Sequence, residues 1–327
     1  MISFDWTVCI CCHNATGRIS PTLNSINRLA YLKSKKIKVL IVDNNSSDDL
    51  FSFINEFNFH ENIHTEIIEE KKPGKGYAQQ KSFSNIDSKY VAYVDDDNLL
   101  DEDYLCNAQC IFESDDKISF VGGQSFFPEK YDSLPKTIVK KYFSRSIAVG
   151  QQRKESGYVY RNILWGAGMC LRMETVKKLH LDSYQFILHR VDKNGLILSG
   201  EDSELCLLLL NAGTVGYYSD DLKLIHDAGE SRLNISYFIN LFFGFGATSP
   251  VFQIYNKNID LKLFNANKEA LKAPKNVSKK DFPMYVCIFT ILGVSFFLGA
   301  VYGHLIGRRD AAKNNLKKFK DSLIYEK

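Results

Sequence analysis

The sequence predicts an α/β fold in which helices flank a mostly parallel sheet, followed by an apolar helical segment that associates with a membrane. In the first hundred residues, short β-forming runs alternate with stretches of helical periodicity, which is typical of a parallel sheet covered on both faces. Near the C-terminus, the 26 residues 282–307 contain no Asp, Glu, Lys or Arg, and about 20 apolar residues suffice to span a bilayer. The composition, 45% hydrophobic and 24% charged over 327 residues, excludes a disordered or collagen-like chain.

The first hundred residues supply the repeated strand–helix units. Leu23, Ile26 and Leu29 recur at helical spacing. The polar cluster at 43–49 can turn the chain after one strand and cap the helix that follows. We expect strands at 7–11, 38–42, 65–69 and 90–94, and helices at 20–32, 50–57 and 76–86.

The middle of the chain, residues 118–230, mixes short strands and loops with one clear helix. That helix begins near Asp202 and takes its apolar face from leucines at 205, 208 and 209. The apolar run at 222–225 predicts a further strand, which His226 follows.

The character of the chain changes after residue 230, which predicts four segments. Residues 233–256 are uncharged, and seven lysines follow at 257, 262, 268, 272, 275, 279 and 280. We expect a catalytic domain at 1–230, a partly apolar and then lysine-rich connection at 231–281, an apolar membrane-associated helix at 282–307 and a basic tail at 308–327.

The apolar segment 282–307 admits several arrangements. It is long enough to span a bilayer, but a buried core helix is the alternative. Glycines at 299, 303 and 307 recur every fourth residue and would let another helix approach closely. A single span, or a hairpin with 233–256 as its other leg, would place basic residues on the outer side, against the positive-inside tendency. A helix lying in the inner leaflet, with the flanking lysines against anionic lipid, does not conflict with this tendency.

Charge and cysteine content exclude other classes. The net charge of +3 is too small for a nucleic-acid-binding protein without a local basic stripe. Eight cysteines, several in apolar runs, suggest buried thiols in a reducing compartment, and their spacing offers no zinc site. The N-terminus lacks the pattern of a signal peptide, so that we expect residues 1–230 in the cytoplasm.

The acidic cluster Asp95-Asp96-Asp97 is the strongest candidate site. Three successive carboxylates at the end of a strand repel one another unless a cation or solvent intervenes. Alternate side chains face the same way, so Asp95 and Asp97 can hold Mg²⁺ or Mn²⁺, which in turn binds diphosphate. The alternative is a solvated turn that caps a helix.

Three further motifs are candidates for chemistry. Lys75 between two glycines can approach phosphate, although this is no Walker A loop. Asp202, crowded by Glu201 and Glu204, can act as a general base, although acidic residues are also ordinary in the first turn of a helix. The small residues around Gly168 suit either a flat ligand such as a sugar or a tight strand crossing.

The order of these motifs resembles that of family 2 glycosyltransferases, which are inverting enzymes of the GT-A fold, over residues 5–230. The resemblance rests on six short motifs in order: Ile10-Cys11-Cys12-His13-Asn14, Val42-Asp43-Asn44-Asn45-Ser46-Ser47-Asp48, Gly74-Lys75-Gly76-Tyr77-Ala78, Tyr93-Val94-Asp95-Asp96-Asp97, Gly166-Ala167-Gly168-Met169 and Gly200-Glu201-Asp202.

The resemblance implies a role for each motif. Asp97 matches the most direct metal ligand, Asp202 the catalytic base, and Lys75 a contact to the diphosphate. Asn44 stands where many members place an aspartate against the nucleobase. The candidate residues are Asp202 and Glu201 for catalysis, Cys11, His13, Asn14, Asp43, Asn44, Lys75, Asp95, Asp96 and Gly168 for the nucleotide sugar, and Asp97, Asp95 and His226 for the metal.

The sequence therefore predicts a metal-dependent inverting glycosyltransferase that uses Mn²⁺ or Mg²⁺ and a UDP-sugar at the cytoplasmic face of the membrane. A lipid-linked or cell-surface glycan precursor is the expected acceptor, and no nucleic acid is expected as a partner. Only Glu230-Ser231-Arg232 follows the base, where processive synthases carry Gln-x-x-Arg-Trp, which disfavours a processive enzyme. The alternatives are a non-catalytic membrane-bound scaffold and a sugar nucleotidyltransferase.

Overall fold

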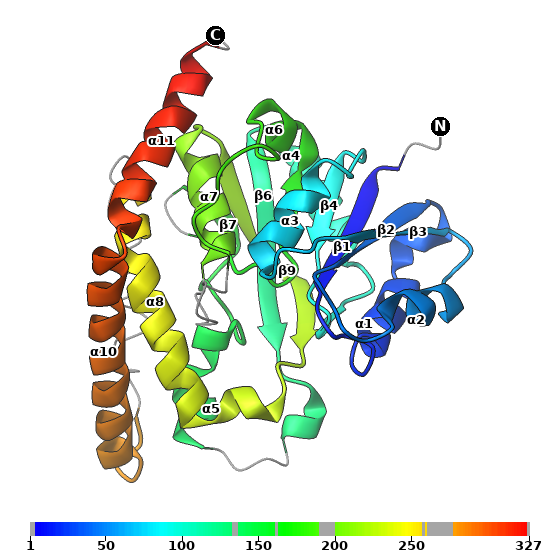
Figure 1. The fold of residues 1–327 in the computed structure, drawn as a ribbon. Coiled ribbons are helices and arrows are strands. Elements are labelled where there is room, and N and C mark those ends of the chain that lie inside the picture. The colour runs from blue at the N-terminus through cyan, green and yellow to red at the C-terminus, as the bar shows by residue number, and fades with distance from the viewer. Residues whose placement is uncertain are drawn as a thin grey trace.

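One sheet forms the centre of the protein, and helices cover both of its faces (Figure 1). The structure is a computed structural model that describes residues 4–132, 137–160, 163–189, 200–256, 259 and 277–325. The strand order is β3-β2-β1-β4-β8-β6-β9-β5, with β7 paired to β9. The strands are β1 Trp6–Cys12, β2 Ile37–Asp43, β3 Ile63–Glu69, β4 Tyr90–Tyr93, β5 Asn98–Leu100, β6 Ile118–Phe126, β7 Gly157–Val159, β8 Cys170–Arg172 and β9 Val215–His226.

The first half of the sheet is parallel, as the alternation of strands and helices predicts. β1 lies between β2 and β4, and β3 pairs with β2. A hydrophobic core lies on each face of the sheet, and β1 contributes to both. Cys9 packs on one face, while Val8 and Ile10 pack on the other. The carboxyl ends of these strands meet at one edge, where Cys12 pairs with Asp43.

The second half of the sheet is mixed. β8 is antiparallel to β4 and β6, and β5 and β7 are antiparallel to β9, while β6 and β9 are parallel. In the β5–β9 pair, Asn98 lies opposite His226. This pairing brings the acidic cluster next to a histidine more than a hundred residues away in the sequence.

Two groups of helices cover the sheet. The first core contains residues of α3, α6 and α7, and the second contains residues of α1, α2 and α4. The helices of this region are α1 Ser20–Asn27, α2 Leu50–Glu56, α3 Lys75–Phe83, α4 Tyr104–Ser114, α5 Ile138–Phe143, α6 Met173–Lys178 and α7 Glu201–Asn211, with short 3₁₀ turns η1 Ala30–Lys33, η2 Glu129–Tyr131, η3 Ser144–Ile147 and η4 Glu230–Leu233.

The helix expected over 20–32 is interrupted. α1 ends at Asn27, and Leu29 adopts an extended conformation before η1 begins. The Ala30 N–H donates to the Glu102 carbonyl at 2.8 Å instead of continuing the helix. A tertiary hydrogen bond therefore ends a helix whose apolar periodicity continues.

Three helices follow the sheet: α8 Ile235–Asn256, α10 Phe282–Leu305 and α11 Arg308–Tyr325. By length and composition alone, α8 and α10 could each cross a membrane. Five of the seven connecting lysines, at 257, 262, 268, 272 and 275, lie outside the described residues.

Glycines let α8 and α10 pack backbone against backbone. A Cβ atom on Gly299 would collide with the Phe243 carbonyl oxygen, and one on Gly303 with the Ala247 carbonyl oxygen. The expected close approach therefore holds at these two positions. Gly307 meets nothing within 4 Å; its φ of +73° instead lets the chain turn between α10 and α11.

Candidate functional site

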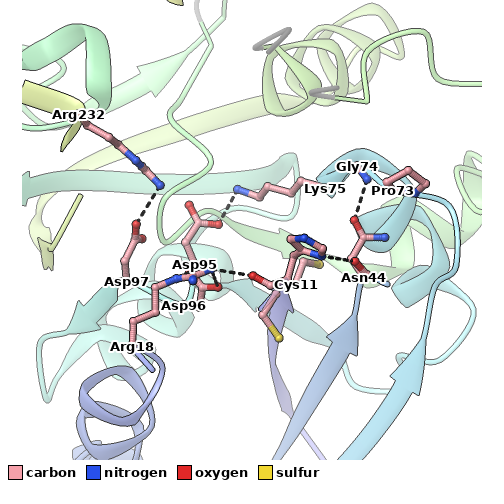
Figure 2. Close-up of a pocket in the computed structure, with 12 residues that line it drawn as sticks. Cys11, Arg18, Asn44, Pro73, Gly74, Lys75, Asp95, Asp96, Asp97 and Arg232 are labelled. Carbon is pink, nitrogen blue, oxygen red and sulfur yellow. Dashed lines mark hydrogen bonds and ion pairs between the residues drawn. The ribbon is translucent and has the colours of Figure 1, made fainter. Parts of the chain in front are cut away.

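A pocket of about 390 Å³ opens at the carboxyl edge of the parallel strands, a volume within the usual range for small-molecule sites. Figure 2 shows how side chains from the strand-end loops, α3 and η4 converge on it. Its lining residues are Cys11, Cys12, His13, Arg18, Asn44, Pro73, Gly74, Lys75, Asp95, Asp96, Asp97 and Arg232.

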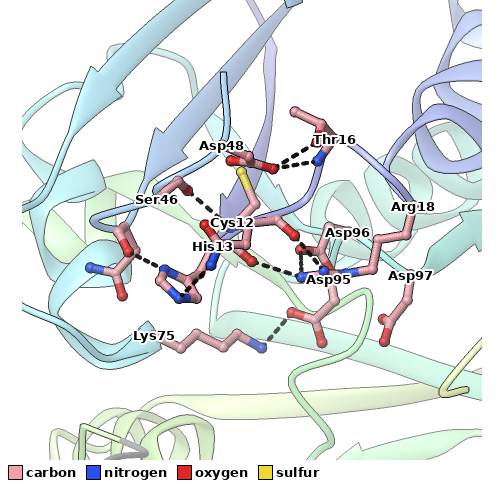
Figure 3. Close-up of polar contacts among 12 residues, drawn as sticks. Cys12, His13, Thr16, Arg18, Ser46, Asp48, Lys75, Asp95, Asp96 and Asp97 are labelled. Carbon is pink, nitrogen blue, oxygen red and sulfur yellow. Dashed lines mark hydrogen bonds and ion pairs between the residues drawn. The ribbon is translucent and has the colours of Figure 1, made fainter. Parts of the chain in front are cut away.

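Arg18 joins the loop after β1 to the acidic cluster (Figure 3). Its Nε and Nη2 atoms donate to the two carboxylate oxygens of Asp96, at 3.0 and 2.6 Å. Its guanidinium also donates to the carbonyl oxygens of Asn14 and His13. Burial raises the pKa of Asp96, against the opposing effect of Arg18. The carboxylate of Asp96 is thus bound by Arg18 through two hydrogen bonds.

Lys75 begins α3 and points at two carboxylates. Its Nζ atom lies 2.6 Å from Asp95 Oδ1 and 4.0 Å from Asp202 Oδ2. Gly74, with φ of +130°, turns the chain immediately before it. A side chain at Gly74 would also collide with the His189 carbonyl oxygen, so a glycine is required there.

The amide of Asn44 fixes the loop that carries Lys75. Its Nδ2 atom donates to the Glu70 and Lys72 carbonyls at 3.0 and 2.6 Å, and its Oδ1 accepts from the Gly74 N–H at 2.7 Å. Asn44 is 6% exposed. Asn44 lines the pocket, but its amide hydrogen-bonds to the backbone of this loop.

His13, Asn14 and Asp43 build the adjoining strand-end loops. The His13 Nδ1–H donates to the Asn44 carbonyl at 2.9 Å. Asn14, at φ +50°, accepts from the Ser47 N–H at 2.7 Å. Asp43 accepts from the Ser46 N–H at 3.1 Å. His13 lines the pocket, whereas Asn14 and Asp43 are not among its lining residues.

Cys11 lines the pocket as a protonated thiol. Its hydrogen bond with Cys9 and its burial raise the pKa of Cys11 well above the ordinary value. A thiol in this state is a poor nucleophile.

Asp97 and His226 face each other at the side of the pocket. The His226 Nε2 and Asp97 Oδ1 atoms are 3.5 Å apart, and both side chains are buried. His226 Nδ1 lies 3.4 Å from the Ala148 carbonyl, which favours a proton on Nδ1 and leaves the lone pair of Nε2 directed at Asp97. His226 Nε2 has no hydrogen-bond partner within the described chain.

This pair fits a divalent cation. Two ligands, each about 2.1 Å from one ion and at right angles, lie about 3 Å apart, close to the separation of these atoms. No group of three or more His, Cys, Asp or Glu side chains that could hold a metal occurs among the described residues. Asp97 and His226 would therefore leave most of the coordination sphere to a ligand or water.

Arg232 was missing from the candidates. Its Nη2 atom lies 3.2 Å from Asp97 Oδ2, and it lines the pocket from η4. The sequence signal for this residue was its position shortly after β9. Arg18 was missed for a different reason: its partner lies 78 positions away in the sequence.

Asp202 lies at the N-terminus of α7 against the backbone of Gly166. A Cβ atom at Gly166 would collide with the Asp202 carboxylate, so the position of this carboxylate requires a glycine there. The neighbouring Glu201 is 5% exposed and accepts from the Gly200 N–H at 3.0 Å. Gly168, at φ +74°, packs on Tyr104, whose hydroxyl donates to its carbonyl. Glu201, Asp202 and Gly168 lie outside the pocket lining, although Lys75 reaches Asp202.

The sheet, with its parallel half, mixed half and flanking helices, is the GT-A fold of glycosyltransferases. A solved structure of the mannosyltransferase PcManGT from Pyrobaculum calidifontis, in complex with GDP-Man and Mn²⁺, matches 94% of this chain and 89% of its own with a TM-score of 0.60 and 15% identity. The chain belongs to the family described as glycosyl transferase family 2, whose model matches residues 7–169.

A second solved structure, S. aureus TarS 1-349, matches 99% of this chain and 92% of its own, with a TM-score of 0.48 and 12% identity. No curated protein sequence matches the chain.

Proposed function

We propose that the protein transfers a sugar, with inversion, from a UDP-sugar to a hydroxyl of a lipid-linked or cell-surface glycan precursor at the cytoplasmic face of the membrane. The observation that carries the proposal is the position of Lys75, whose ammonium group lies beside both Asp95 and Asp202. A cationic contact for a diphosphate and a carboxylate for an acceptor proton therefore stand next to each other.

In this mechanism Asp202 accepts the proton of the acceptor hydroxyl while that oxygen attacks the anomeric carbon. The bond between this carbon and the diphosphate oxygen breaks on the opposite face, which inverts the configuration. Lys75 and Arg232 stabilise the negative charge of the departing diphosphate. Arg18 holds the acidic cluster against the loop after β1.

Mn²⁺ or Mg²⁺ is the proposed cofactor, with Asp97 and His226 as ligands and Asp95 on the same side of the pocket. When bound, the ion would act as a Lewis acid on the diphosphate. The orphaned His226 Nε2 supports this assignment.

The proposed location rests on two features. α8 and α10 are long and apolar enough to associate with a membrane. All eight cysteines are free, as expected for a reducing compartment. We propose that residues 1–230 carry the catalytic residues and that 282–307 is the membrane-associated helix.

A donor panel tests the proposed function. The purified protein is mixed with UDP-, GDP- or dTDP-sugars and with Mn²⁺, Mg²⁺ or EDTA, and thermal stability and nucleotide release are measured. We expect metal-dependent stabilisation by the UDP class, lost in Asp97→Ala. A chain that responds to no nucleotide in the presence of metal would be a scaffold rather than an enzyme.

Asp202→Asn tests the proposed base. We expect sugar transfer to fall by about 10²–10⁴-fold, with nucleotide-sugar affinity nearly unchanged. Asp116→Asn is the matched control, because the side chain of Asp116 is fully exposed and removing its charge leaves the pocket intact. Persistent transfer in Asp202→Asn would rule out this base.

A further inference from the structure

The mode of membrane attachment follows from the way in which α10 is built into the protein. α8 and α10 run in parallel with a constant offset of 56 positions, since Ser295 Oγ donates to the Ile239 carbonyl, Gly299 packs on Phe243 and Gly303 on Ala247. The two helices therefore form one unit rather than an up-and-down hairpin.

The folded domain holds both ends of this unit. At the start of α10, Lys141 of α5 lies 2.6 Å from Asp281, and the rings of Phe143 and Tyr285 stack at 5.4 Å. Beyond its end, Phe319 of α11 packs against Tyr184 at 5.7 Å.

α8 is bound to the same domain near both of its ends. Phe143 contacts Phe238 and Phe242 near its start. Near its end, the Tyr255 hydroxyl donates to Glu204 of α7 at 2.9 Å. A helix pair that crossed a bilayer would carry these flanking parts of the catalytic domain, with Lys141 and Glu204, into the hydrocarbon region, where charged and polar groups are costly.

The face of α10 that points away from the domain is apolar and uncovered. Phe297 is 66% exposed, Leu298 54% and Leu305 80%. The 24 residues of the helix carry no Asp, Glu, Lys or Arg and extend about 36 Å. Exposed apolar surface of this extent marks an interaction site.

Exposed basic residues lie at both ends of this face. Lys279 and Lys280 precede α10, and Lys313, Lys317 and Lys318 are exposed on α11. Figure 1 shows α10 and α11 in line along one edge of the molecule. An apolar surface between two basic ends matches acyl chains below a layer of anionic headgroups.

We propose that α10 lies flat in the interface of an anionic bilayer, with its outward face against the acyl chains and the lysines of α11 on the headgroups. This specifies the membrane attachment that forms part of the proposed function. The catalytic domain then stays on one side of the membrane, beside the lipid surface.

Spin-label depths along α10 test this orientation. Nitroxides are attached at Met284→Cys, Ile291→Cys, Leu298→Cys and Leu305→Cys in a chain carrying Cys110→Ser and Cys287→Ser. Bound to vesicles with anionic lipid, all four should lie at one shallow depth of about 5–10 Å. A depth that passes through the bilayer centre along the helix would overturn the proposal in favour of a span.

Charge reversal tests the headgroup contact. Lys317→Glu/Lys318→Glu should weaken binding to anionic vesicles by at least about tenfold, while Lys177→Glu/Lys178→Glu, an exposed lysine pair on α6, should not. Equal binding of the first variant and the native protein would overturn the headgroup contact. Labels shielded in a vesicle-free dimer, with no insertion into lipid, would assign the face to a second copy of the chain.

Nucleotide release from a soluble donor separates this proposal from the proposed function. Neither lysine pair touches the pocket, so both variants should keep native release. Loss of vesicle binding with retained release in Lys317→Glu/Lys318→Glu would support the proposed attachment and would not affect the proposed function.

Discussion

At the scale of single residues, Asn44 illustrates how a pocket residue can act through the backbone. Its amide makes three hydrogen bonds to the loop between Glu70 and Gly74. The buried Gly74 N–H would otherwise lack a partner, which costs about 1–3 kcal/mol. We infer that Asn44 positions Lys75 and leaves the choice of nucleobase to other groups.

Asn44→Asp separates positioning from base recognition. The carboxylate can still accept from the Gly74 N–H but faces the Glu70 and Lys72 carbonyls without a proton to donate. We expect KM to rise about 10- to 100-fold for every nucleotide donor tested, with their ranking unchanged. A changed ranking among UDP, GDP and dTDP donors would show base recognition instead. Asn107→Asp is the control, because it removes a hydrogen bond that the Asn107 side-chain amide donates to the Asp221 carbonyl, outside the pocket lining.

At the scale of elements, a buried carboxyl group connects α7 to α8. Glu204 accepts from the N–H groups of Ile187 and Leu188 and from the Tyr255 hydroxyl. The segment it holds continues to His189, whose ring stacks on Tyr77 at 3.6 Å, beside the Lys75 loop. Glu204 thus ties the C-terminal helices to the wall of the site.

The pH dependence of stability tests the state of Glu204. Burial raises its pKa from 4.5 to about 7, against the opposing hydrogen bonds from Leu188, Tyr255 and Ile187. Between these two values the folded protein retains a proton that the unfolded chain has released, so the free energy of unfolding falls as pH rises. The expected loss across this window is about 3 kcal/mol.

Glu204→Gln should remove that slope, because the amide does not titrate. The measurement is denaturant unfolding at several pH values between 4.5 and 7. Glu174→Gln, an exposed glutamate on α6, should leave the slope as it is in the native protein. An unchanged slope in Glu204→Gln would show that another group titrates in this range.

The contact between α8 and α10 provides a matched pair of glycines. Gly299→Ala should lower the free energy of unfolding by about 1–3 kcal/mol, because its Cβ would collide with the Phe243 carbonyl. Gly293→Ala, in the same helix with nothing within 4 Å, should stabilise by about 1 kcal/mol through helix propensity. Equal effects in thermal or chemical unfolding would contradict the observed packing of the two helices.

At the scale of the whole molecule, the sequence predicts best what depends on local order. The strand ends at Asp43 and Asp95 follow from short apolar runs and their polar boundaries, and the parallel half of the sheet follows from the alternation. The pairs Arg18–Asp96 and Asp97–Arg232 join distant segments that no periodicity relates. The mixed half of the sheet could not be predicted from the sequence either, since its strand pairings depend on tertiary contacts.

The packing of the C-terminal helices was likewise not predictable from the sequence, because it depends on which parts of the domain they cover. Val251, Phe252 and Tyr255 of α8, with Leu316 and Phe319 of α11, lie in the same core as the leucines of α7. The pattern of charge along the sequence places the end of the catalytic domain at residue 230. In the structure the hydrophobic core continues beyond that residue into α8 and α11.

A chain ending at residue 230 should therefore fail to fold cooperatively. Burying each large apolar side chain contributes about 1.5–3 kcal/mol, so that losing five of them removes about 10 kcal/mol, comparable to the whole stability of a domain. Circular dichroism and thermal unfolding should show no sharp transition, whereas a chain ending at Ser322, which keeps Phe319, should melt within a few degrees of the native protein. A cooperative transition in the 1–230 chain would establish that the catalytic domain folds without α8, α10 and α11, and that these helices are an appendage.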